Sequence, residues 1–181
     1  GAVDSLYSEI YPLLAKVASD SSPAALDPGL NMMLAFIDNA PAAITEREIG
    51  SSNASLIVAI VEAIIDKTFS ARKELQTKGQ QVLLQIMQVS SPEPAVKQLL
   101  QHLQDKKLKV SPMCLETIKL ALQAYGAAAM PVQMSSVIAA LPKALDSALG
   151  NVREQAMSLL VELARFIGKS PLQLSVLDKL R

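Results

Sequence analysis

The segment Asn151-Val-Arg-Glu begins a helical pattern with a basic residue, and the same arrangement recurs at Ser70-Ala-Arg-Lys and Lys107-Leu-Lys-Val. A fourth helix begins at Asp20-Ser-Ser-Pro without a basic residue. Successive turns of this kind are separated by roughly 40 to 50 residues, the period at which helix pairs stack into a solenoid. The recurring turn therefore predicts paired, stacked helices with the basic turns along one edge.

The composition allows a sizeable core and gives no sign of a charged partner. Of the 181 residues, 50% are hydrophobic and 19% are charged, so the chain falls outside the disordered class. Lys plus Arg and Asp plus Glu both number 17. Because the formal net charge is zero, bulk electrostatics indicates neither a nucleic-acid nor a membrane partner, and any charged function depends on local clustering.

Cysteine and histidine usage excludes further kinds of site. A single cysteine, Cys114, excludes a disulfide framework, and a single histidine, His102, leaves too few soft ligands for an ordinary zinc site. We therefore expect no metal and no cofactor, and an intracellular protein.

The longest apolar run, 56–65, is interrupted by Glu62 and is too short to span a bilayer. We interpret His102 as a surface imidazole and Cys114 as a small buried hydrophobe.

Apolar residues recur at spacings of three and four almost throughout, and the alternation typical of strands is hard to find. We predict an all-α fold of nine helices, forming one α-solenoid domain over residues 1–181 with about four helix pairs and the start of a fifth. Residues 40–54 interrupt the pattern, and residues 171–180 begin the last helix. The residues expected to face the core are Leu6, Ile10, Leu13 and Val17; Leu26, Leu30, Met33, Leu34 and Ile37; Leu56, Ile57, Ile60, Val61 and Ile64; Leu75, Gly79, Val82 and Ile86; Val96, Leu99, Leu100 and Leu103; Leu115, Ile118, Leu122 and Tyr125; Val132, Val137, Ile138, Leu141 and Leu145; Val152, Ala156, Leu159, Leu163 and Phe166, with Met32, Met87 and Met157 as further core filling.

Glycine and asparagine mark particular positions in these helices. Gly79 lies inside an apolar stripe, which indicates close approach of two helices. Gly126 and Gly168 follow the last periodic residues of their helices and are predicted to end them. Asn151, with Glu154 three residues later, is predicted to be an N-cap.

Charge is unequal between the two rows of turns. The turns within pairs should lie along one edge, and those between pairs along the other. The within-pair row contains Arg72, Lys73, Lys106, Lys107, Lys109 and Arg153, whereas the between-pair row contains Asp38, Glu46, Arg47, Glu48 and Glu93. A neutral protein is therefore predicted to have one basic edge.

Several segments of the chain resemble the TOG domain, the HEAT-repeat array of microtubule polymerases that binds the tubulin heterodimer. The resemblance runs nearly end to end and is greatest to a first TOG domain of such proteins. It rests on Lys109-Val-Ser-Pro-Met-Cys-Leu-Glu-Thr-Ile-Lys, Leu141-Pro-Lys-Ala-Leu and Val152-Arg-Glu-Gln-Ala. Asp20-Ser-Ser-Pro-Ala-Ala, Phe36-Ile-Asp-Asn-Ala, and Arg72 followed by Gly79 resemble the corresponding family turns and helices.

The resemblance implies a tubulin-binding module of a microtubule-associated protein, which engages αβ-tubulin through the within-pair turns and regulates microtubule polymerisation. It further implies a cytoplasmic, cytoskeletal protein found on microtubules, at spindle poles or at centrosome-like organising centres, and an isolated domain that is monomeric. Arg153 should be a bidentate anchor on the acidic surface of tubulin. The residues implied at the interface are Arg72, Lys106, Lys107, Lys109, Asn151, Val152 and Arg153, with weaker contributions from Ser22, Pro23 and Ala24.

Two departures from the family pattern affect this interface. The family's second turn offers a bulky aliphatic contact, whereas Pro23-Ala-Ala presents small side chains. The family's first turn contributes a tryptophan, whereas this chain contains none and is interpreted as beginning at the second repeat. Because a tryptophan in a pocket is a typical interface hot spot, we expect weaker binding than that of a chain with the first repeat.

Two other classes of function stay open at this point. A generic HEAT or armadillo scaffold, or a degenerate TOG domain, would bind a non-tubulin protein through its flank or concave face. An enzyme is the least favoured reading, because neither a glycine-rich phosphate loop nor a metal-ligand spacing occurs. The carboxylates of Glu46 and Glu48 flank Arg47, which is typical of a solvated cluster rather than of an acid-base pair.

Overall fold

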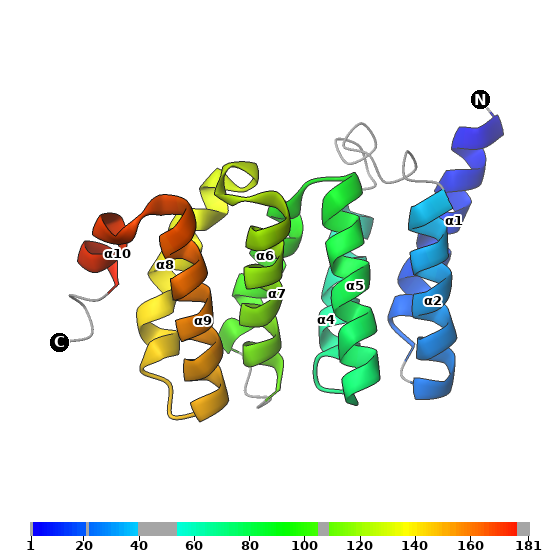
Figure 1. The fold of residues 1–181 in the computed structure, drawn as a ribbon. Helices are drawn as coiled ribbons and strands as arrows, with labels where there is room; N and C mark the ends of the chain where they lie inside the picture. Colours follow the sequence, from blue (N-terminus) through cyan, green and yellow to red (C-terminus); the bar gives the residue numbers. More distant parts are fainter. Residues whose placement is uncertain (1, 21, 40–53, 105–108, 177–181) are drawn as a thin grey trace. The chain divides into compact units, whose positions relative to one another are not determined.

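The computed structural model describes residues 2–20, 22–39, 54–104 and 109–176. These residues form nine α-helices and two short 3-10 helices, without a strand among them (Figure 1). The all-α prediction is thereby confirmed. The chain divides into two compact units, Gly1–Ser91 (unit 1) and Pro92–Arg181 (unit 2).

Unit 1 consists of two antiparallel helix pairs. Helices α1 (Ala2–Ala18) and α2 (Pro23–Asn39) form the first pair, and α4 (Ala54–Thr68) and α5 (Lys73–Val89) form the second. Helix α1 packs against α4, and α2 packs against α5. The apolar stripes meet between the helices, where Leu30, Ile64 and Phe69 are fully buried. Stacking therefore joins first helix to first helix and second helix to second helix, as expected for solenoid repeats.

Close backbone approach and polar contacts hold unit 1 together. A Cβ added at Gly79 of α5 would overlap the Oγ1 of Thr68 and lie 2.8 Å from its Cβ, which confirms the close approach predicted there. Between α5 and α2, the Nζ of Lys78 lies 2.7 Å from the Oδ1 of Asp27. The Nε2 of Gln85 donates to the Oδ1 of Asp38 at 3.0 Å. The stacked pairs are thus joined by polar side chains as well as by apolar packing.

Unit 2 repeats the same plan. Its elements are α6 (Pro92–Gln101), η3 (His102–Gln104), α7 (Val110–Tyr125), η4 (Ala127–Ala129), α8 (Pro131–Leu145), α9 (Gly150–Ile167) and α10 (Lys169–Ser175). Helix α6 packs against α8, α7 packs against α9, and α10 lies on α8 and α9. Between α7 and α9, the Nζ of Lys119 bonds the Oγ of Ser158 at 3.1 Å, and the Nε2 of Gln123 donates to the Oε2 of Glu162 at 3.0 Å.

Two predicted glycine positions end helices in unit 2. Gly126 has φ 77° and Gly168 has φ 82°, which lie in the left-handed region that favours glycine. The backbone N–H of Gly126 donates to the carbonyl of Leu122, and that of Gly168 donates to the carbonyl of Ala164. Both predictions of a helix end are confirmed.

Other predictions of orientation are wrong. Leu13 is 57% exposed, because Leu14 beside it turns into the core instead. Val132, in the first turn of α8, is 69% exposed, and Phe166, in the last turn of α9, is 45% exposed. Of the methionines expected in the core, Met33 and Met87 are buried, whereas Met32 and Met157 are exposed.

The predicted N-cap at Asn151 is also wrong. Helix α9 begins one residue earlier, at Gly150, and extended Leu149 is the N-cap, whose carbonyl accepts from the N–H of Arg153. The Oδ1 of Asn151 accepts instead from the neighbouring N–H of Val152. Helix α10 likewise begins at Lys169 rather than at residue 171.

Some predictions fall outside the described residues. These include the interruption over residues 40–53, with Glu46, Arg47 and Glu48, the predicted interface residues Lys106 and Lys107, and the end of the last helix beyond residue 176. Among the helices that are described, none is long and apolar enough to cross a membrane. Cys114 is fully buried, as expected.

Candidate functional site

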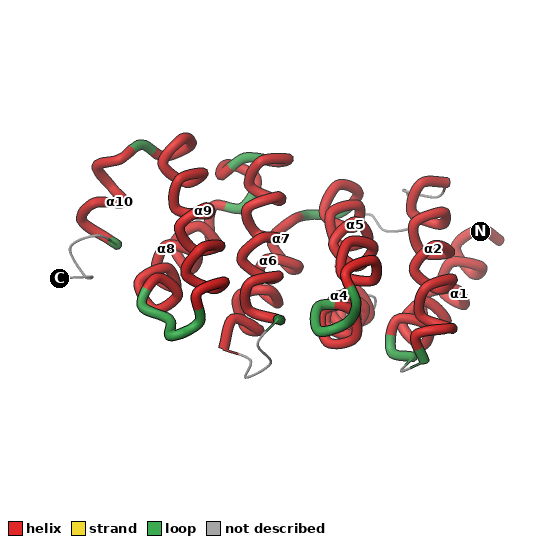
Figure 2. Tube along the Cα trace, turned by 60° about the horizontal axis from the view of Figure 1, so that its bottom comes forward, coloured by secondary structure: helices red, strands yellow, loops and turns green. Residues whose placement is uncertain are grey.

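The within-pair turns of each unit lie at one end of that unit, which we call its turn end. In unit 1 these turns join α1 to α2 and α4 to α5, and in unit 2 they join η3 to α7 and α8 to α9. Figure 2 brings the turn ends forward. The predicted interface residues that the structure describes all lie at or beside these turns, as the alternation of antiparallel helices requires.

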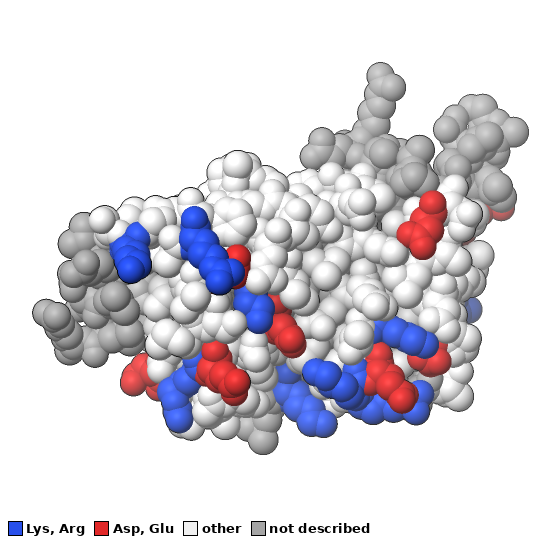
Figure 3. Space-filling model, viewed as in Figure 1, with Lys and Arg blue, Asp and Glu red and all other residues white. Residues whose placement is uncertain are grey.

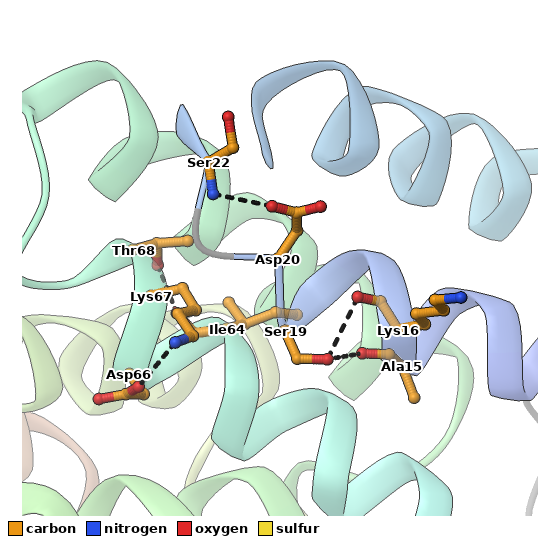
Figure 4. A network of polar contacts seen from close by, with 9 residues as sticks. All are labelled: Ala15, Lys16, Ser19, Asp20, Ser22, Ile64, Asp66, Lys67 and Thr68. Atoms are coloured by element: carbon orange, nitrogen blue, oxygen red, sulfur yellow. Dashed lines mark hydrogen bonds and ion pairs between the residues drawn. The ribbon is translucent and has the colours of Figure 1, made fainter. Parts of the chain in front are cut away.

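Short polar contacts define the first turn of unit 1 (Figure 4). The Oγ of Ser19 donates to the carbonyl of Ala15 at 2.6 Å, and the Oδ1 of Asp20 accepts from the N–H of Ser22 at 2.7 Å. Ser22 and Ala24 are exposed, and Pro23 is the first residue of α2. This turn therefore presents a carboxylate and small side chains rather than a cation.

The second turn of unit 1 carries Arg72 and is held by a buried amide. The Nε2 of Gln76 donates to the carbonyl of Phe69 at 3.0 Å, and the N–H of Ala71 donates to the carbonyl of Thr68. Phe69 is fully buried, so this turn is fixed to the core. Arg72 is exposed, with its Nε 3.5 Å from the Oε2 of Glu74.

The charges at the turn end of unit 1 are mixed. Asp66 and Lys67 form an ion pair at 3.6 Å there, in addition to the pair that Arg72 forms with Glu74. In Figure 3, blue and red side chains are correspondingly interspersed along this end. The prediction of a basic edge overlooked these acids, because it counted only cations in the within-pair turns. Glu74 lies in the first turn of α5. Asp66 and Lys67 close the preceding helix.

Lys109 is exposed at the first turn of unit 2. It is the N-cap of α7 with αR backbone dihedrals, and its side chain makes no capping bond. Across the same turn, the Oγ of Ser111 donates to the carbonyl of Leu103 at 2.8 Å, which ties the start of α7 to η3. Lys106 and Lys107 lie outside the described residues.

Arg153 is exposed at the second turn of unit 2 and folds back over that turn. Its Nη1 donates to the carbonyl of Ser147 at 2.6 Å. The N–H of Leu149 donates to the Oγ of Ser147 at 3.2 Å, so Ser147 organises the turn from both sides. The remaining N–H groups of the guanidinium belong to the planar fork with which arginine binds carboxylates. Asn151, also exposed, lies beside it in the first turn of α9.

Val152 differs from the other predicted interface residues because it is only 5% exposed. Its side chain lines a hollow of about 570 Å³ within unit 2, together with Leu103, Leu115 and Leu149. The side chain of Val152 therefore packs inside unit 2, at the start of α9. Neither this hollow nor the role of Ser147 is predictable from the sequence, since both depend on which turns the fold brings together.

The described residues contain no group of three or more His, Cys, Asp or Glu that could hold a metal ion. Burial raises the pKa of Tyr125, which lies at the end of α7 remote from the turns. The turn ends thus offer a partner exposed cations, carboxylates interspersed among them in unit 1, and an apolar hollow in unit 2.

Comparison with curated proteins finds relatives over nearly the whole chain. Protein MOR1 of Oryza sativa subsp. japonica is 24% identical over 178 residues, which are 98% of this chain and 8% of MOR1. Protein mini spindles of Drosophila melanogaster is 26% identical over 162 residues, which are 90% of this chain and 7% of mini spindles. The chain therefore spans less than a tenth of the length of either relative.

Solved structures share the fold, and a family model gives the family. The C. elegans Zyg9 TOG domain superimposes with a TM-score of 0.75 at 20% identity, covering 97% of this chain and 68% of that chain. A TOG-array structure from work on tubulin recruitment by microtubule polymerases gives a TM-score of 0.82 at 20% identity, covering 94% and 34%. The family model for the XMAP215/Dis1/CLASP TOG domain matches residues 3–181, and this chain therefore belongs to the XMAP215/Dis1/CLASP family of TOG domains.

Proposed function

We propose that this domain binds αβ-tubulin through its within-pair turns and, as one module of a longer cytoskeletal protein, regulates microtubule polymerisation. The observation that carries the proposal is the position of Lys109 and Arg153, both exposed at the turn end of unit 2, in a chain whose family match covers residues 3–181. Solved structures with the same fold come from work on TOG-tubulin binding specificity and on tubulin recruitment.

The electrostatics of the turns suits an acidic protein partner. Exposed cations on a rigid scaffold steer association and form charge-assisted hydrogen bonds with carboxylates. Ser111, two residues after Lys109, donates to the carbonyl of Leu103, and Ser147 accepts from the N–H of Leu149 in the turn before Arg153, so hydrogen bonds hold backbone close to both cations. Little conformational freedom is then lost on binding, which favours affinity.

Unit 1 contributes less to this attraction. Arg72 has Glu74 at 3.5 Å, and the first turn presents Asp20 instead of a cation. The small side chains at Ser22 and Ala24 offer little area for an apolar anchor. We therefore assign most of the electrostatic binding to unit 2, and we assign multivalent action at microtubule ends to further modules in the longer protein.

The test is a fluorescence titration of labelled αβ-tubulin with the 181-residue chain, supported by size-exclusion chromatography. The double variant Lys109→Gln/Arg153→Gln should weaken binding by about tenfold or more, since it removes two charge-assisted contacts. The matched control is Lys97→Gln/Lys169→Gln, which removes two exposed charges from the same unit away from its within-pair turns. No binding by the wild-type chain, or equal losses in both double variants, would contradict the proposal.

A second candidate is a scaffold that binds a non-tubulin protein through a helix face. The observation that favours it is an exposed apolar pair on α9, where Met157 and Val161 are each 51% exposed one turn apart. Such a face would bind independently of Lys109 and Arg153. Replacing both residues with glutamine should leave the tubulin affinity unchanged under our proposal and abolish partner binding under the scaffold alternative.

A further inference from the structure

The hollow at the turn end of unit 2 has an apolar wall built from several elements. Leu103 of η3, Leu115 of α7 and Val152 of α9 line it, and Leu149 of the last turn is 37% exposed beside them. Its volume of about 570 Å³ lies within the range of pockets that receive ligands or the side chains of a partner. Because Ser111 binds the carbonyl of Leu103, the wall on the η3 side is held in place.

The rim of the hollow is charged. Lys143, Asp146 and Ser147 line it, and the hydrogen bond from Arg153 to the carbonyl of Ser147 keeps the guanidinium at the same edge. The rim thus carries both signs, with Lys143 and Arg153 as its cations and Asp146 as a carboxylate. A carboxylate that approaches Arg153 is attracted to its guanidinium.

We infer that this hollow receives an apolar side chain of αβ-tubulin that has a carboxylate beside it on the tubulin surface. The inference rests on the proposed function and deepens it, because it adds an apolar anchor to the charged contacts. The side chain enters between Leu115, Leu149 and Val152, while the carboxylate binds Arg153. Ser111, two residues after Lys109, lines the hollow, as do Leu149 and Val152 close to Arg153, so a protein that docks on Lys109 and Arg153 lies next to it.

The physical basis is the usual anatomy of an interface hot spot. An anchor that fills a pocket is shielded from water by the polar contacts around it, and such anchors carry most of the binding energy. Water beside the leucine and valine side chains of the wall finds no polar partner there, so an apolar occupant is favoured over solvent on that side of the hollow. Arg153 alone would not discriminate one acidic surface from another, whereas the hollow adds shape.

The test fills the hollow with larger side chains introduced on helix α8. Ala144 is half-buried and Ala140 lies one helical turn before it on α8, and both line the hollow. Ala144→Phe and the smaller Ala140→Leu should weaken tubulin binding, Ala144→Phe by about tenfold or more. Ala128→Phe is the matched control, because Ala128 is exposed in η4, which connects the pairs of unit 2 away from the turn end. Thermal unfolding of each variant reports whether unit 2 still folds.

A direct readout accompanies the affinities. With leucine methyl groups labelled, saturation of tubulin should reduce the NMR signals of Leu115 and Leu149 in the wild-type chain, and this transfer should disappear in Ala140→Leu. If wild-type chain binds tubulin while both filled variants bind equally well and the leucine signals are unaffected, the inference is overturned and the proposed function stands. If wild-type chain does not bind tubulin, both fall. If Ala144→Phe fails to fold, Ala140→Leu and the methyl signals decide the matter.

Discussion

Replacing Gly79 with alanine tests the packing that positions the turn of Arg72. Gly79 faces Thr68 across the close contact of α4 and α5. Thr68 directly precedes Phe69, which is fully buried. The added Cβ would lie 2.8 Å from the Cβ of Thr68 and 3.2 Å from its Cγ2, and it would overlap its Oγ1. Heavy atoms of this kind do not approach so closely, so α4 and α5 must separate or Thr68 must rotate.

The magnitude follows from three opposing effects. Alanine is favoured over glycine inside a helix by about 1 kcal/mol. Rotation of Thr68 is resisted because its β-branched side chain is stiff, and it would break the hydrogen bond from Oγ1 to the carbonyl of Ile64 at 2.7 Å, which contributes about 1 kcal/mol. Overpacking of a buried contact costs about 1–3 kcal/mol. We therefore expect Gly79→Ala to lower the free energy of unfolding by about 1–3 kcal/mol.

Urea denaturation followed by circular dichroism measures this free energy. Gly150→Ala is the control, since the nearest atom to its added Cβ would be the Nη2 of Arg153 at an ordinary 3.7 Å, and its stability should equal or exceed that of the wild type. Thr68→Ala should recover part of the loss in Gly79→Ala, with a coupling of about 0.5–3 kcal/mol. A Gly79→Ala chain as stable as the wild type, or strictly additive effects in the double variant, would refute the reasoning.

Three further predictions concern the turns. Gln76→Ala should lower the free energy of unfolding by about 1–3 kcal/mol, because it leaves the carbonyl of Phe69 without its side-chain donor, whereas exposed Thr77→Ala should change it little in the same urea assay. Arg153→Lys should weaken tubulin binding by about threefold to tenfold in a fluorescence titration, because it keeps the charge but loses the planar fork; equal affinities would show that charge alone suffices. Raising the salt concentration from about 0.1 M to about 1 M shortens the screening length from about 10 Å to about 3 Å and should weaken tubulin binding progressively, whereas salt-independent affinity would point to an apolar face such as that of Met157 and Val161.

The helices and their ends were predictable because their signals are local. A stripe such as Leu75, Gly79, Val82 and Ile86 needs only a spacing of three and four to identify a buried helix face, and these residues are buried as expected. Gly126 and Gly168 were identifiable because few other residues adopt the positive φ at which these helices end.

Orientation at ambiguous positions was not predictable, because a local pattern does not say where neighbours end. Leu13 and Leu14 are adjacent and both apolar, so spacing alone does not determine which faces α4 and α2. Val132 and Phe166 continue their stripes correctly but lie in terminal turns that their neighbours leave uncovered. Helix α9 starts at Gly150 because Leu149 is extended, and leucine is not a residue type that marks an N-cap in a sequence.

By itself the sequence determined an all-α chain of paired helices, and it identified Arg72, Lys109 and Arg153 as the cations at helix-opening turns. Helical periodicity and turn chemistry depend on neighbours within a few residues, so they can be recognised in the sequence without knowledge of the fold. Only the tertiary structure decided that Leu103, Leu115 and Val152, from three different elements, line one hollow and that Arg153 lies at its rim. Those features arise where separate helices and turns meet, and the distances between them are properties of packing rather than of any one segment.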